Sequence, residues 1–290
     1  MYKNGLKVIT IWVDANASTM GAAVAFYTIF AIAPLFILVL ALAGFFFGHQ
    51  AAQNQLFGEI AKLVGKSGSH SIQSLLVAAN RPKATLWATI TGFATLFIGA
   101  SSVFIQLQDS LNAIWNVRLK SSGIRSFLRY RLVSFVALLA IGFLLLVSLI
   151  VSATLDAAAA WMTGNTHLFL WRIIDFFVSL GIITLLFAMI FKWLPDVKIS
   201  WRDVWIGALI TAVLFTIGKF LLGAYLGRGS LSSAYGAAGS FVVVLLWVYY
   251  STQILLFGAA IVRVYANRYG SCIRPAANAE FVTRNKSHSH

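Results

Sequence analysis

The sequence predicts an all-α fold: a polytopic membrane protein built as a six-helix transmembrane bundle with an amphipathic outer helical hairpin. Two observations predict it. Of the 290 residues, 60% are hydrophobic and only 10% are charged, whereas a soluble domain carries about 25% charged residues. The apolar residues also fall into blocks long enough to cross a bilayer core, which requires roughly 20 residues of helix.

We predict one membrane domain over residues 1–270, with six spans. They lie at about 22–47, 85–107, 132–154, 168–191, 203–225 and 237–262. The first block is longer than the roughly 7–15 apolar residues of a signal peptide, so it is expected to stay in the chain as a helix.

Three segments outside the spans have their own patterns. Residues 1–20 carry apolar side chains at helical spacing, which fits an amphipathic helix on the inner membrane surface or, equally, a frayed terminus. Residues 48–84 repeat apolar positions at the spacing of an amphipathic helix and contain the stop Arg81-Pro82, which predicts the outer helical hairpin. Residues 271–290 are polar, which predicts a disordered cytoplasmic tail.

The distribution of positive charge predicts the orientation. With the N-terminus inside, 15 of the 22 lysines and arginines fall on the inner side and 6 on the outer side. This bias places both ends of the chain in the cytoplasm. The net charge of +14 is therefore interpreted as contact with anionic membrane lipid, and nucleic acid is not expected as a partner.

Enzyme chemistry finds little support in the sequence. Cys272 is the single cysteine, which excludes an intrachain disulfide and a cysteine-based metal cluster. The five histidines form no pair at metal-binding helical spacing, and no G-x-S-x-G elbow is present. We expect no catalytic residues, no metal and no cofactor, although a triad of residues distant in sequence stays open.

Polar residues within or beside the spans are the candidates for function, because a charge inside a bilayer costs several kcal/mol. One set follows a single helical face around Asp109: Ser102, Gln106, Asp109, Asn112 and Asn116. Such a stripe could line a water-filled inner cavity. The alternative is that this helix projects into the cytoplasm and the stripe is its wet face.

Four further residues are pathway candidates. Asp175 lies in the fourth span and could instead be neutralised by Arg172, three residues earlier. Lys219 lies in the fifth span and could instead extend its ammonium group to the surface. Tyr249 and Gln253, in the sixth span, could line a pathway or form hydrogen bonds between helices.

Several motifs resemble the YihY/BrkB family of bacterial inner-membrane proteins. They include Ala22-Ala23-Val24-Ala25-Phe26-Tyr27-Thr28, Leu107-Gln108-Asp109-Ser110-Leu111-Asn112-Ala113-Ile114-Trp115, Leu194-Pro195-Asp196-Val197 with Trp201-Arg202-Asp203-Val204, and Tyr235-Gly236-Ala237-Ala238-Gly239-Ser240. The resemblance implies a six-helix bundle in the inner membrane. Members of the family often have an acidic residue where this chain has Ala260, so a role for that carboxylate does not carry over.

The function predicted from these features is that of a permease-like membrane protein for an unidentified solute. A non-catalytic envelope-maintenance or partner-binding scaffold, with the outer hairpin as its contact surface, is the alternative. The ribonuclease label attached to the family is a third hypothesis. The sequence leaves the solute, any coupling ion, any protein partner and the oligomeric state open.

Overall fold

A computed structural model describes residues 2–29, 31, 86–120, 168–226 and 239–282 of the chain. The predicted third span at 132–154 and the predicted outer hairpin at 48–84 lie outside these residues. The described part is mostly helical. Its elements in chain order are α1 (Tyr2–Asp14), α4 (Leu86–Trp115), β1 (Val117–Leu119), α6 (Leu168–Trp193), β2 (Val197–Lys198), α7 (Trp201–Leu226), α9 (Gly239–Tyr269), β3 (Arg274–Pro275) and β4 (Ala279–Phe281).

Four of the predicted spans coincide with long helices, α4, α6, α7 and α9, but two of these helices run further than their apolar blocks. Helix α4 ends at Trp115 rather than at 107, and α9 ends at Tyr269 rather than at 262. The thickness of the bilayer sets the length of the apolar block, but the helix ends only where its backbone leaves the helical conformation. For α4 that turn is Asn116, which has a φ of 58°, a left-handed conformation that asparagine tolerates.

The N-terminal segment is helical, which confirms that it forms a helix and excludes the frayed terminus; its place on the inner membrane surface stays a prediction. Helix α1 ends at Asp14, and a second helical stretch, Ala17–Ile29, follows after a bend of 58°. Asn16 makes the bend with a φ of 51°. Val8 is buried and Trp12 packs against the core, while Leu6 and Ile9 on the other face are exposed. Only the beginning of the predicted first span is described.

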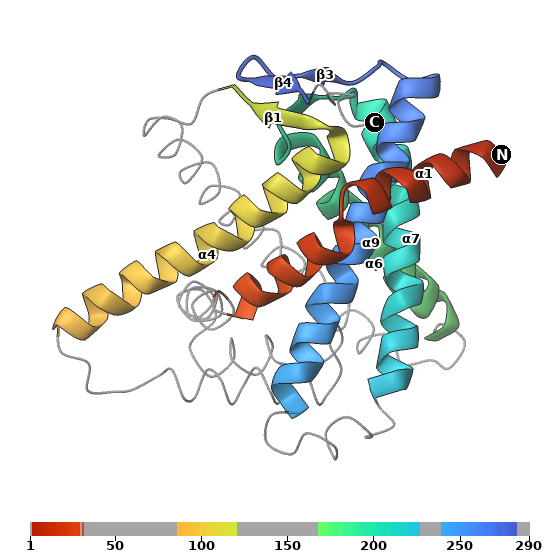
Figure 1. The fold of residues 1–290 in the computed structure, drawn as a ribbon. Helices are drawn as coiled ribbons and strands as arrows, with labels where there is room; N and C mark the ends of the chain where they lie inside the picture. The colour runs from red at the N-terminus through yellow and green to blue at the C-terminus, as the bar shows by residue number, and fades with distance from the viewer. Residues whose placement is uncertain (1, 30, 32–85, 121–167, 227–238, 283–290) are drawn as a thin grey trace.

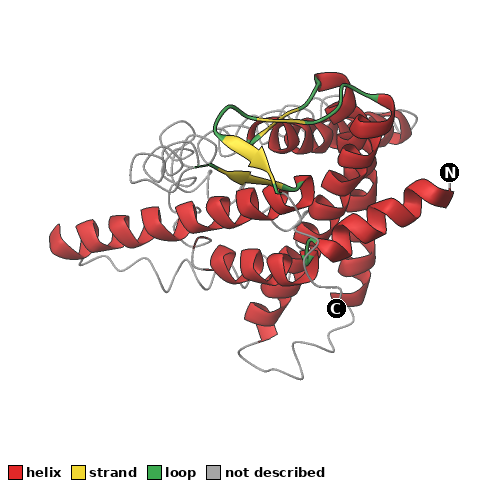
Figure 2. Cartoon of the chain, turned by 45° about the horizontal axis from the view of Figure 1, so that its top comes forward, coloured by secondary structure: helices red, strands yellow, loops and turns green. Residues whose placement is uncertain are grey.

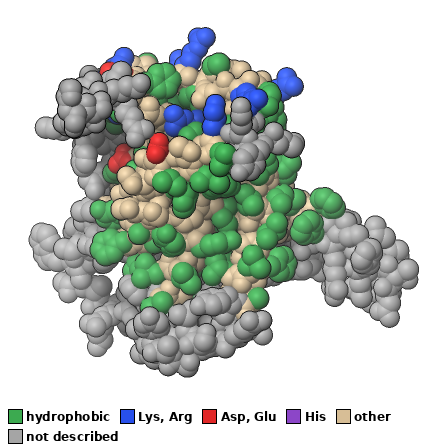
Figure 3. Space-filling model, turned by 45° about the vertical axis from the view of Figure 1, so that its right-hand side comes forward, with side chains coloured by type: hydrophobic (Ala, Val, Ile, Leu, Met, Phe, Trp, Pro, Cys, Tyr) green, Lys and Arg blue, Asp and Glu red, His purple; other side chains and the backbone are tan. Residues whose placement is uncertain are grey.

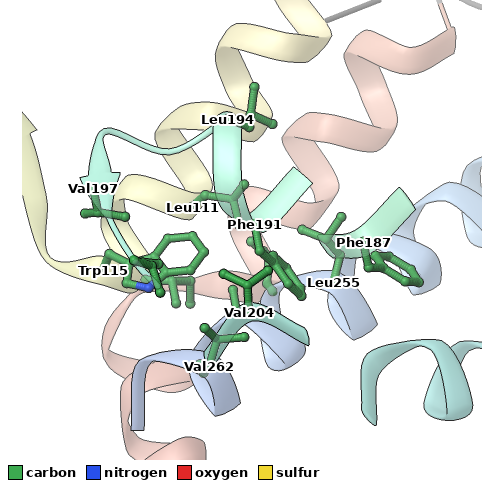
Figure 4. Close-up of a cluster of buried hydrophobic side chains, with 14 of the residues drawn as sticks. Leu111, Trp115, Phe187, Phe191, Leu194, Val197, Val204, Leu255 and Val262 are labelled. Atoms are coloured by element: carbon green, nitrogen blue, oxygen red, sulfur yellow. The ribbon is translucent and has the colours of Figure 1, made fainter. Parts of the chain in front are cut away.

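The helices pack around α9 (Figure 1). Helix α7 lies between α6 and α9, and both α1 and α4 pack against α9. Figures 1 and 2 show that α4 lies next to the other helices at its C-terminal end, beside β1, and that its N-terminal part runs away from α6, α7 and α9. The buried core joins the C-terminal ends of α4 and α6 to α7 and α9 (Figure 4). There Trp115 meets Phe191 edge-on at 6.2 Å between ring centroids, and Phe187 stacks on Phe191.

Three described helical segments are long and apolar enough to cross a membrane: Phe176–Trp193, Trp201–Leu222 and Val242–Tyr269. A fourth would be the bent pair at the N-terminus, if it forms one span. Large apolar side chains on α6 and α7 are exposed, among them Phe177, Phe220 and Leu221. Figure 3 shows hydrophobic side chains over most of one flank and lysines and arginines gathered at one end. This pattern is that of helices whose solvent is lipid.

Four short strands form two small antiparallel sheets at the charged end, so the fold is not purely α-helical. Strand β1 pairs with β4, and β2 pairs with β3. The prediction of a disordered tail from 271 is therefore wrong for residues 271–282. Composition alone predicted disorder, but the backbone of this segment finds partners in the segments that follow α4 and α6, which the local sequence does not reveal.

Candidate functional site

The polar side chains of the described residues gather at the end of the bundle that carries the strands. The first group surrounds Asp196, in the turn between α6 and β2. Gln108 Nε2 and Asn112 Nδ2 donate hydrogen bonds to Asp196 Oδ2 at 3.0 and 2.8 Å. The backbone N–H of Asp196 donates to Asn112 Oδ1 at 2.9 Å. Gln108 and Asn112 are both buried, so we call this group the Asp196 clamp.

The Asp196 clamp follows from the spacing of residues on α4. Gln108 and Asn112 are four residues apart and therefore project from the same side of the helix. The Asp196 carboxylate accepts from two amides, and hydrogen bonds to a charged group are worth about 1.5–3 kcal/mol each. The backbone carbonyl of Asp196 also accepts from Ala276 N at 2.9 Å. One residue thus joins α4, the α6–α7 connection and the C-terminal strands.

A second carboxylate, Asp203, holds the C-terminal segment against α7. Asp203 is buried in the first turn of α7, and its Oδ2 accepts from Ser271 N at 3.0 Å and Ser271 Oγ at 2.9 Å. A Cβ at Gly270 would collide with this carboxylate, so glycine is needed there for close approach. We call these residues the Asp203 clamp. A carboxylate near the start of a helix also interacts favourably with the helix dipole.

Backbone contacts at the end of α4 complete the arrangement. Asn116 Nδ2 donates to Val282 O at 3.1 Å, and Val282 N donates to Asn116 O at 2.9 Å. Arg263 of α9 donates from Nη1 to Ile114 O at 2.6 Å, which satisfies a carbonyl that the helix end leaves open. An exposed ion pair joins Arg118 to Glu280 at 2.9 Å across β1 and β4.

The members of the predicted stripe on α4 differ in how deeply they are buried. Asn112 is buried in the Asp196 clamp, while Ser102 and Gln106 are half-buried and Asp109 is exposed. Asp109 lies past the predicted span that ends at 107. Although its side chain reaches the surface, the protein around its carboxylate removes part of its water. This desolvation, and then repulsion by Asp196, raise the pKa of Asp109 above its ordinary value.

The other predicted pathway residues are spread over three helices. Gln253 on α9 donates from Nε2 to Ala17 O at 3.1 Å, and its buried Oε1 accepts no hydrogen bond from the described residues. Tyr249 and Lys219 are half-buried, on α9 and α7 respectively. Asp175 belongs to α6, but its side chain lies outside what the structure describes. Of the three whose side chains are described, Gln253, Tyr249 and Lys219, none is part of either clamp.

Sequence reasoning did not select Gln108, Asp196, Asp203 or Ser271 as site residues. Three of them, Gln108, Asp196 and Asp203, belong to the motifs by which the chain resembles a family. Membership in those motifs was the sequence signal that could have identified them. What the sequence could not show is that the turn after α6 and the segment after α9 meet at α4. Within the described ranges, no group of three or more His, Cys, Asp or Glu side chains could hold a metal ion.

These observations define the class: a helical membrane protein with several spans, tied at one end by a buried carboxylate, Asp203, and a half-buried one, Asp196. The particular family follows from comparison, because residues 8–282 match the model of the family described as virulence factor BrkB. The chain belongs to this BrkB family, as the motifs predicted.

Relatives bear out the membrane assignment. The chain is 29% identical to a UPF0761 membrane protein of Saccharophagus degradans over 89% of its own length and 58% of the relative's. It is 26% identical to a UPF0761 membrane protein of Pseudomonas paraeruginosa, over 87% of its length and 60% of the relative's. A third, from Actinobacillus pleuropneumoniae, is 26% identical over 86% of this chain and 88% of the relative. The chain thus spans about three fifths of the first two relatives. No solved structure matches it.

Proposed function

We propose that this protein is a permease-like protein of the bacterial inner membrane, with both described ends of the chain on the cytoplasmic side. In this proposal the polar side of α4 that includes Ser102, Gln106 and Asp109 lines the cytoplasmic part of a pathway for a small solute. The observation that carries the proposal is the division of the α4 polar residues between a buried clamp and an accessible stripe.

The division matters because the clamp accounts for some polar residues and leaves others unexplained. Gln108 and Asn112 are needed to hold Asp196. Gln106 lies inside the predicted span, where polar groups are costly and often mark a pathway for water, ions or substrate, and Asp109 lies just past the end of that span. A carboxylate with a raised pKa at such a position suits a role in binding a cation or proton.

The cytoplasmic assignment rests on charge. Lys192, Lys198, Arg202, Arg263, Arg268 and Arg274 lie at the ends of the helices or on the strands next to them. Cytoplasmic loops carry an excess of lysine and arginine. The strand-bearing end is therefore taken as the cytoplasmic one, which puts Asp109 at the inner mouth of the pathway.

Cysteine accessibility tests the proposal without knowledge of the solute. The background is Cys272→Asn, because Cys272 is exposed with a φ of 55° and asparagine accepts that conformation better than serine. Single cysteines are placed at 102, 106 and 109, with the buried positions Phe104 and Leu111 as matched controls. A membrane-impermeant thiol reagent is applied to intact cells and to inverted vesicles.

We expect inverted vesicles to label positions 109, 106 and 102, and the two controls to stay unlabelled from both sides. Labelling at position 109 but not at 106 or 102 would indicate that the helices are packed without a water-filled pathway. In that case the scaffold hypothesis, in which the protein binds a partner and transports nothing, would replace the permease proposal.

A further inference from the structure

Two positive side chains lie directly opposite each other on the small sheet of β2 and β3. Lys198 is the strand partner of Arg274, and both side chains are exposed. Directly opposed residues of an antiparallel pair have Cβ atoms about 4.5–5.5 Å apart, and like charges at such positions are destabilising. Among the described residues no carboxylate forms an ion pair with either of them. The pair therefore lacks the counter-charge that its geometry calls for.

The nearby carboxylates are committed elsewhere. Asp196 holds Gln108 and Asn112, Asp203 holds Ser271, and Glu280 pairs with Arg118 on the other sheet. A third cation, Arg202, is exposed in the first turn of α7, next to the β2 strand. We call the surface formed by Lys198, Arg202 and Arg274 the basic corner; no carboxylate in the described ranges forms an ion pair with any of the three.

Tryptophans place the basic corner at the depth of lipid headgroups. Trp193, Trp201 and Trp205 are 62%, 41% and 43% exposed, and the Trp193 and Trp201 rings meet edge-on at 5.8 Å. The Lys192 ammonium lies over the Trp201 ring, 5.6 Å from its centroid, and donates to the carbonyl of Ile199. Exposed tryptophan next to cations is characteristic of the interface between water and membrane.

An apolar stripe leads from the corner along α7. Its exposed members recur every four residues, so each one neighbours the next while the stripe winds gradually around the helix; they are Trp201, Trp205, Leu209, Val213 and Ile217. A ligand that satisfied both features would need an anionic head for the basic corner and a hydrocarbon chain for the stripe.

We propose that the basic corner is a binding site for an anionic phospholipid, whose phosphate lies between Lys198 and Arg274. Arg202 contacts the headgroup, and an acyl chain follows the α7 stripe. The bound phosphate supplies the counter-charge that the sheet lacks. This site is independent of the α4 stripe, so it stands whether or not the protein transports a solute.

The test uses the full chain in neutral detergent, titrated with phosphatidylglycerol, with phosphatidylcholine of the same acyl chains, or with inorganic phosphate. Phospholipids with brominated chains report binding through quenching of tryptophan fluorescence. The variant is the double substitution Lys198→Gln with Arg274→Gln. The matched control, Lys7→Gln with Lys120→Gln, removes the same charge from exposed positions on α1 and after β1.

We expect the unmodified chain and the control to bind phosphatidylglycerol in preference to phosphatidylcholine. The Lys198/Arg274 variant should lose that preference, with affinity for phosphatidylglycerol lower on the order of 30-fold, since each basic residue near an anionic surface contributes a factor of about five. Without phosphatidylglycerol, the same variant should unfold at a higher temperature than the unmodified chain, because the like-charge repulsion is gone.

Two results would overturn the proposal. Equal loss of phosphatidylglycerol binding in the control variant would mean a general charge effect, and inorganic phosphate that competes at equal concentration would mean a site for free anions. If the double variant does not fold, the single substitution Arg202→Gln, outside the sheet, must still weaken phosphatidylglycerol binding by a smaller factor; unchanged binding there would also count against the site.

Discussion

The strand-bearing end of the molecule and the middle of its helices are held together in different ways. At the strand-bearing end, polar side chains bond across elements, as in the Asp196 and Asp203 clamps. In the helix middles the hydroxyl groups bond within their own helix. Thr211 donates to Gly207 O at 2.7 Å and Thr252 donates to Val248 O at 2.8 Å, both four residues back.

The middles of α7 and α9 meet by close backbone approach. A Cβ at Gly258 of α9 would lie 2.9 Å from the Cβ of Thr211 on α7, and one at Gly207 of α7 would lie 3.2 Å from the Cβ of Val262 on α9. Small residues at helix interfaces permit such packing in lipid, where burial of apolar surface gives no driving force between helices. Close packing at glycines therefore joins the middles of α7 and α9, whereas hydrogen bonds to carboxylates join the elements at the strand-bearing end.

The largest effect expected from this comparison is at the Asp196 clamp. Asp196→Ala leaves the buried amides of Gln108 and Asn112 without their acceptor, and each orphaned group costs about 1–3 kcal/mol. We expect a loss of about 2–5 kcal/mol in unfolding free energy, measured by detergent-induced unfolding. Asp196→Asn, which keeps one acceptor oxygen, should lose less. Glu280→Ala removes only an exposed ion pair and should cost less than about 1 kcal/mol.

The second expected effect tests the helix middles. Gly258→Ala inserts a methyl group against the Thr211 side chain and should destabilise the α7–α9 pair by about 1–3 kcal/mol. Gly181→Ala on α6 is the matched control, because an added Cβ there meets no atom within 4 Å. Equal unfolding curves for the two variants would show that α7 and α9 do not approach as closely as described.

A smaller effect is expected at the Asp203 clamp. Ser271→Ala removes one hydroxyl donor and leaves the backbone N–H bonded to the carboxylate. The expected cost is about 1 kcal/mol of unfolding free energy. Limited proteolysis should cut the variant faster after α9 than the unmodified chain, while cutting elsewhere stays the same. Faster cutting throughout the chain would mean that the serine supports the whole bundle rather than this segment.

The smallest effect concerns pH. Because the folded protein raises the pKa of Asp109, the folded state binds a proton more readily than the unfolded chain, and stability falls as pH rises from about the ordinary pKa of 3.8 through the raised value. Asp109→Asn should flatten this part of the stability–pH curve and be slightly more stable than the unmodified chain at neutral pH. A slope unchanged by the substitution would assign the pH dependence to another group.

The sequence predicted the helices better than the contacts between them. Apolar length located α4, α6, α7 and α9, and the last three are long and apolar enough to cross a bilayer, which imposes that length directly. The stripe that contains Asn112 was found from helical spacing, but its partner Asp196 was not, since the two are 84 residues apart and nothing local indicates that they meet. The prediction of a disordered tail was wrong for the same reason. Strands of two or three residues have too little sequence pattern to be predicted without knowledge of their partner strands.

The pairing of the strands also bears on how the protein is made. A ribosome synthesises β3 and β4 after every other described element, so both sheets and the Asp203 clamp must close after the last described helix has been made. Insertion and closure are therefore separate events in biogenesis. A nascent chain halted just after α9 would already hold the helices that the sheets later join, with Asp203 still waiting for Ser271.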